Sequence, residues 1–111
     1  MKNMMKEAPE VAQSFFDLAK SAREYSPLGM KTNELIILGI FAAHRGLRGI
    51  NTHVERAMEE GATKEEIIAA ILLALPIVGI TDTNLALDEA MIHIDAYMQK
   101  QEQTESAASR S

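Results

Sequence analysis

The 111-residue chain contains no cysteine. This absence excludes disulfide bonds, thiolate metal sites and any catalytic thiol, because each of them needs a sulfur that the chain does not have. Any chemistry that the protein performs must therefore come from carboxyl, imidazole, hydroxyl, amine or guanidinium groups.

Basic residues are few, with 11 Lys and Arg against 16 Asp and Glu and a formal net charge of -5. Nucleic-acid binding needs clustered cations, and these cations are spread along the chain. The acidic balance also argues against an anionic membrane surface. We therefore expect neither nucleic acid nor a membrane as a partner.

A long hydrophobic run is also missing. The longest, Ile67–Ile80, has 14 residues and contains Pro76, whereas a membrane-spanning helix needs about 20. The first ten residues, MKNMMKEAPE, lack the apolar stretch of a signal peptide. The expected location is the cytoplasm.

What the chain does have is a hydrophobic content of 47%, enough for one folded core. We expect a single domain over residues 1–100, in which residues 1–7 form a loose lead-in. The last eleven residues, QEQTESAASRS, are small, polar and aperiodic, and they predict a disordered tail over 101–111.

Helical periodicity dominates the domain and predicts an all-α fold of five helices with short connections. Two of them are apolar on every side over 35–43 and 67–75, which predicts burial in the core or in a subunit interface. The five predicted helices cover about 9–24, 32–43, 49–60, 63–75 and 83–99.

Local signals predict several helix ends. Thr63 and Glu66 have the spacing of a capping box, and Gly61 is placed to end the preceding helix in a left-handed conformation. Thr32 is a candidate N-cap that puts Glu34 in the first turn of its helix. Gly46–Gly49 predicts a turn in which glycine allows positive φ or a close backbone approach.

The candidate functional residues are Glu34 and His53. His53 belongs to the apolar stripe of its helix and is predicted to point inward. A lone inward histidine is also typical of a hydrogen-bonded core residue, and the helix dipole alone would explain Glu34. A metal site made of Glu34, His44 and His53 matches no common ligand spacing, and His93 is predicted to pair with Glu89 on the surface.

The stretch from Lys31 to about Leu87 resembles the carboxymuconolactone decarboxylase and AhpD-like alkylhydroperoxidase superfamily. The resemblance rests on KTNELIILGIFAA, on His53-Val54, on GATKEEI and on a Pro/Gly break before the last helix. In redox members a Glu is followed, after eleven intervening residues, by a Cys. A second Cys follows after two more residues, and a His after three more. Here the same frame holds Glu34, Gly46, Gly49 and His53.

The resemblance implies an all-helical AhpD-like domain that assembles as a trimer or a ring-like hexamer. The peroxidase branch works through two thiols, and without cysteine that mechanism cannot run. The resemblance is therefore to the decarboxylase branch, which implies a lyase that needs no metal and no organic cofactor. Its substrate would be a small cyclic carboxylate.

In that branch His53 would be the proton donor, because imidazole changes charge near neutral pH. Glu34, facing it, would orient the ring and favour its charged form. Arg45 and Arg48 would hold substrate carboxylates, and backbone N–H groups at Gly46 and Gly49 would form an anion site. The alternative interpretations are that the two arginines are solvated or pair with surface carboxylates, and that the two glycines only form a tight turn.

A second hypothesis is a non-catalytic oligomeric member that keeps the fold for ligand binding or assembly. Gly46 and Gly49, at the cysteine positions of the redox frame, fit this hypothesis as well as they fit the lyase hypothesis. On either hypothesis, the wholly apolar segments are more than a domain of this size would readily bury, so we expect a homo-oligomer with residues 67–80 in its interface.

Overall fold

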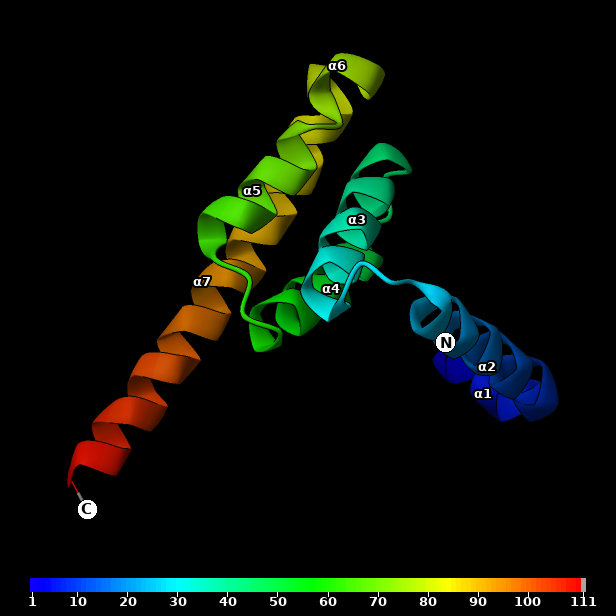
Figure 1. Ribbon diagram of the computed structural model, residues 1–111, viewed down its shortest axis with the longest axis horizontal. Helices are drawn as coiled ribbons and strands as arrows, with labels where there is room; N and C mark the ends of the chain where they lie inside the picture. Colours follow the sequence, from blue (N-terminus) through cyan, green and yellow to red (C-terminus); the bar gives the residue numbers. More distant parts are fainter. Residues whose placement is uncertain (111) are drawn as a thin grey trace.

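The computed structural model describes residues 1–110, and within them every regular element is a helix. The predicted all-α class is confirmed. The helices are α1 (Lys2–Glu7), α2 (Pro9–Tyr25), α3 (Met30–Ala43), α4 (Leu47–Glu59), α5 (Lys64–Leu72), α6 (Leu75–Val78) and α7 (Ile80–Arg110) (Figure 1).

The five predicted helices correspond to α2, α3, α4, α5 and α7, and two short ones were missed. The prediction that residues 1–7 form a loose lead-in is wrong, because Lys2–Glu7 forms helix α1, which packs against α2. The predicted Pro/Gly break contains α6, which begins beside Pro76. Proline is tolerated there because the first turn of a helix leaves its N–H groups unpaired anyway.

The body of the molecule consists of α3, α4, α5 and α7, which pack against one another. Apolar residues spaced three or four apart on each helix meet in one core, as the helical periodicity requires. The fully buried side chains at its centre are Leu38, Ala42, Ile50, Val54, Ala57, Ile67, Ile71, Ala86, Ala90 and Ile94.

The α1–α2 pair forms an arm that lies apart from the body (Figure 1). Ala12 is the buried residue of α2, whereas Val11, Phe15 and Leu18 on the same helix are exposed. The arm joins the body through the irregular link 26–29. The link is also where α2 is hydrogen-bonded to α3, through the Asn33 amide and the Arg23 carbonyl.

Helix α3 begins two residues earlier than predicted. Gly29, at φ 87°, is its N-cap, and the Asn33 N–H donates to the Gly29 carbonyl at 3.0 Å. Thr32 is therefore not the N-cap, and Glu34 is not in the first turn. Because glycine adopts positive φ without steric cost, the chain can turn into a helix before it reaches the hydroxyl side chain. The helix dipole no longer explains Glu34.

Helix α7 is longer at both ends than the predicted 83–99. It begins directly after Gly79, whose φ of 93° makes the turn, so the predicted start at residue 83 lies inside the helix. It also continues through residues 101–110, where the sequence predicts a disordered tail; residue 111 lies outside the described part. No Gly or Pro interrupts this segment, and adding a residue to an existing helix costs much less than starting one.

The capping box is confirmed. The Thr63 hydroxyl accepts from the Glu66 N–H at 3.1 Å, and the Glu66 carboxylate accepts from the Thr63 N–H at 2.9 Å. Gly61 has the predicted left-handed conformation, with φ 92°. The Glu66 carboxylate also receives a bond from Lys31 of α3 at 3.0 Å, which ties the start of α5 to the neighbouring helix.

These bonds lower the pKa of Glu66 below its ordinary value of 4.5, first through the Thr63 N–H and then through the Lys31 ammonium. A lowered folded-state pKa contributes stability above the ordinary value, and that stability is lost as the pH falls through the lowered value. The stability advantage of the wild type over Glu66→Gln should therefore shrink between about pH 6 and about pH 3. Urea unfolding at both pH values measures it. Glu65→Gln, in the same turn without the capping bonds, should show no comparable change.

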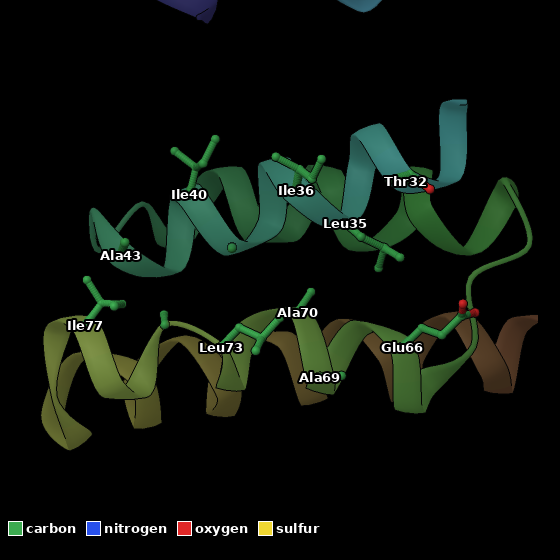
Figure 2. Close-up of a pocket in the computed structure, with 12 residues that line it drawn as sticks. Thr32, Leu35, Ile36, Ile40, Ala43, Glu66, Ala69, Ala70, Leu73 and Ile77 are labelled. Carbon is green, nitrogen blue, oxygen red and sulfur yellow. The ribbon is translucent and has the colours of Figure 1, made fainter. Parts of the chain in front are cut away.

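A groove of about 590 Å³ lies between α3 and the α5–α6 segment (Figure 2). Its lining is almost wholly apolar, with the Lys31–Glu66 ion pair at one end. Ile36 and Ile40 of α3 are 47% and 54% exposed, so in the single chain α3 is not buried on every side as predicted. The other predicted place of burial for this apolar surface is a subunit interface.

Candidate functional site

The structure brings Glu34 and His53 together where α3 and α4 pack against each other. The Glu34 carboxylate, through Oε2, is hydrogen-bonded to Nδ1 of the His53 imidazole. Glu34 is buried at 2% exposure, and the His53 side chain is 13% exposed. A buried carboxylate needs a hydrogen-bond partner, and His53 provides it. The pair therefore has a fixed orientation and one accessible edge.

Phe41, in the last turn of α3, packs against the His53 ring. The two rings stack with centroids 5.2 Å apart and planes inclined by 30°. The imidazole is thus held by Glu34 at Nδ1 and by an aromatic face on one side. This leaves Nε2 as the ring nitrogen available to exchange a proton with a ligand.

The Phe41 ring also explains the two glycines. A Cβ added to Gly49 would lie 2.4 Å from the ring, and one added to Gly46 would lie 2.5 Å from it. Real Cβ atoms do not approach other atoms so closely, so a side chain at either position requires the ring to move. The space that cysteine side chains would need in the redox frame is occupied by phenylalanine.

The predicted turn over Gly46–Gly49 is shorter than expected, because α4 already begins at Leu47 with Gly46 as N-cap. The positive φ occurs at Arg45, at 58°, and not at a glycine. The Gly46 N–H donates to the Phe41 carbonyl at 2.8 Å, and the Leu47 N–H donates to the Arg45 carbonyl at 3.0 Å. These two donors are engaged within the turn, so they are not free for an anion.

His53 opens onto a cavity of about 900 Å³ between the arm and the body. Its floor comes from α3 and α4, and its outer wall comes from α2. All three phenylalanines of the chain line it, together with polar and charged side chains of α2 and α4. The lining includes Phe15, Phe16, Phe41, Asp17, Lys20, Arg23, Asn33, Gly49, Thr52, His53 and Arg56.

The structure does not bring Arg45 and Arg48 to this cavity, since neither is among its lining residues. Arg45 forms an ion pair with Asp82 of α7, with 3.2 Å between Nε and Oδ1. Gly49 does line the cavity, whereas Gly46 faces the ring of Phe41. Of the six predicted site residues, Glu34, His53 and Gly49 therefore share one site.

The other two histidines lie elsewhere. His93 pairs with Glu89 at 2.9 Å, as the four-residue spacing predicts. His44 caps the end of α3 and is exposed. Within residues 1–110, no group of three His, Asp or Glu side chains is arranged to hold a metal ion.

The sequence alone did not identify Phe41, Asn33, Arg23 or Arg56 as parts of the site. Arg56 follows His53 by three residues and so shares its face of α4, a spacing that could have been used. Two glycines three residues apart also indicate that something bulky lies against one face of a helix. Nothing in the sequence indicated which side chain it is.

Comparison with known proteins gave one match. The family model described as the carboxymuconolactone decarboxylase family matches residues 9–91, which is most of the chain. No curated protein and no solved structure is significantly similar to this chain. Among the described residues, no helix combines the length and the apolar character that crossing a membrane requires.

Proposed function

Because the chain belongs to the carboxymuconolactone decarboxylase family, we propose that it is a cofactor-independent lyase. It removes CO₂ from a small, cyclic, unsaturated carboxylate by acid–base catalysis. The observation that carries this proposal is the buried Glu34–His53 pair at the wall of a cavity large enough for such a ligand.

The reaction needs few protein groups. The bond between the ring carbon and the carboxylate breaks, CO₂ leaves, and the electron pair moves into the conjugated carbonyl of the ligand. A proton must then be delivered to carbon, and the negative charge on oxygen must be stabilised meanwhile. His53 supplies the proton from Nε2, and Glu34 holds Nδ1 so that the charged ring is oriented and stabilised. Solvent returns the proton to His53 after product release.

The direct test is turnover of carboxymuconolactone, followed by its ultraviolet absorbance and by CO₂ release. We expect activity in the wild type and a loss of about 10²–10⁴-fold in His53→Ala, the range for a positioned acid or base. His93→Ala, which removes a histidine remote from the cavity, is the matched control and should keep wild-type activity. Equal turnover by wild type and His53→Ala would refute the role given to His53.

A non-catalytic, ligand-binding role is the alternative, and one observation favours it. Phe41 covers one face of His53 and fills the space that the redox frame gives to sulfur. If the wild type turns over no unsaturated cyclic carboxylate but still binds one, this alternative holds. The hydrogen-bonded pair beside an open cavity is what makes the lyase the stronger proposal.

Self-assembly forms a further part of the proposal. Leu73 and Ile77 at the groove are 76% and 81% exposed, and large apolar areas of this kind are typical of interaction sites. We expect a trimer or hexamer whose interface includes residues 67–80. Light scattering after size exclusion should give a multiple of 12.2 kDa. A monomer mass at micromolar concentration would contradict this prediction.

A further inference from the structure

Two cations at the wall of the His53 cavity have no counter-charge. Arg23 of α2 and Arg56 of α4 both line it, and neither side chain makes an ion pair or hydrogen bond within residues 1–110. The other charged lining groups are engaged. Lys20 lies 3.8 Å from Glu24, and Asp17 accepts a bond from Gln13 at 2.9 Å. The lining thus carries the cations Lys20, Arg23 and Arg56 against the one carboxylate of Asp17, so the net charge at this wall is positive.

Arg56 is fixed relative to His53 because both are on α4. Gly49, Thr52, His53 and Arg56 follow the spacing of one helix face, and all four line the cavity. A ligand held by the guanidinium of Arg56 therefore lies along the same face as the imidazole. At Gly49 the Phe41 ring packs directly against this face of α4, so the ring borders the site beside His53.

Arg23 is brought to the same cavity by a small hydrogen-bonded latch. The Asn33 amide, which is 7% exposed, donates to the Arg23 carbonyl at 3.4 Å. The Ser26 hydroxyl bonds to the Asn33 side-chain oxygen at 2.5 Å and accepts from the Leu28 N–H at 3.2 Å. Since Asn33 directly precedes Glu34, the latch attaches the last turn of α2 to the part of α3 that carries the carboxylate partner of His53.

We propose that Arg23 and Arg56 form the carboxylate anchor of this site, and that the ligand carries a second carboxylate besides the one that leaves as CO₂. This inference rests on the proposed function and names the residues that hold its substrate. Guanidinium groups bind carboxylates through paired, charge-assisted hydrogen bonds. The faces of Phe15, Phe16 and Phe41 supply flat apolar walls for the ring of the ligand.

The anchor also decides which carboxylate is lost. A carboxylate held by two arginines is stabilised as an anion, and binding that favours the ground state does not accelerate its departure as CO₂. The anchored carboxylate is therefore the one that the product keeps. The leaving carboxylate belongs beside Phe41 and Ile37, where the lining is apolar and a charge is poorly solvated.

Binding of benzoate to the full-length protein tests the anchor without turnover. Benzoate is planar and carries one carboxylate, and benzamide is its neutral analogue. Calorimetry should show tighter binding of benzoate than of benzamide by the wild type. Arg56→Gln and Arg23→Gln should each weaken benzoate binding about tenfold or more, the value of one lost charge-assisted bond. Neither change should affect benzamide.

Lys100→Gln removes an equal charge from α7, outside the cavity, and should leave benzoate binding unchanged. Circular dichroism and thermal unfolding confirm that each variant is folded. Equal affinity of the wild type for the two probes, or unchanged benzoate binding by both arginine variants, overturns the anchor. So does a loss in Arg48→Gln as large as in Arg56→Gln. Because benzoate is not decarboxylated, none of these results depends on whether the lyase reaction occurs.

Discussion

Glu34→Gln should lower kcat about 10²–10⁴-fold while the protein stays folded. Glutamine has nearly the same shape, so its side-chain amide can still bond to Nδ1 of His53. It carries no negative charge to stabilise the imidazolium, and its amide can hold the ring in the wrong tautomer. Steady-state kinetics on carboxymuconolactone measures the effect, and KM should change much less than kcat because Glu34 does not touch the ligand.

Glu89→Gln is the matched control for this prediction, because Glu89 forms the other Glu–His pair of the chain, with His93. It should keep wild-type kinetics. Benzoate binding by Glu34→Gln should also be unchanged, which shows that the cavity has kept its shape. Wild-type kcat in Glu34→Gln would remove the carboxylate from the mechanism and leave it as a structural partner of His53.

Gly49→Ala should have opposite effects on stability in two backgrounds. With Phe41 present, the new Cβ meets the ring at 2.4 Å and must displace it from His53. Overpacking of this kind costs about 1–3 kcal/mol, against a gain of about 1 kcal/mol from replacing glycine inside a helix. In a Phe41→Ala background the clash is gone and the gain should remain.

The measurement is a double-mutant cycle by urea unfolding at one fixed protein concentration, since self-assembly would make stability depend on concentration. We expect a coupling energy between positions 41 and 49 of about 2 kcal/mol. Gly39→Ala is the control, because its Cβ would lie 3.3 Å from the Ala70 carbonyl and would have no atom of the Phe41 ring within 4 Å. It should have the same effect in both backgrounds. If the changes at positions 41 and 49 had additive effects on the free energy of unfolding, the ring would move aside without cost.

The cycle also bears on whether this chain could hold the cysteines of the redox frame at positions 46 and 49. A cysteine at position 49 has the same Cβ as alanine, so the ring of Phe41 opposes a thiol there as it opposes a methyl group. Restoring the redox frame would therefore take a change at position 41 in addition to the two glycines. Because the ring of Phe41 lies against positions 46 and 49, glycine at both positions is explained by packing.

Some parts of the fold were predictable because their cause is local. The capping box at Thr63–Glu66 and the left-handed Gly61 depend on residues within one helix turn, and both are confirmed. The helical spacing of apolar residues likewise predicted five helices that the structure contains. The start of α3 was predicted wrongly at Thr32, because Gly29 with its positive φ lets the chain turn into the helix earlier, and this depends on the path of the connecting link.

The sequence by itself determined that the protein is helical, that it has no thiol chemistry, and that Glu34 and His53 keep the spacing of a known family frame. Composition and periodicity suffice for the first two conclusions, and the third rests on the resemblance to the family. Only the tertiary structure showed that Phe41 fills the space beside Gly46 and Gly49, and that Arg23 and Arg56, not Arg45 and Arg48, line the cavity with His53. These facts depend on how α2, α3 and α4 pack, and side chains from separate helices meet at angles and distances that no single helix encodes.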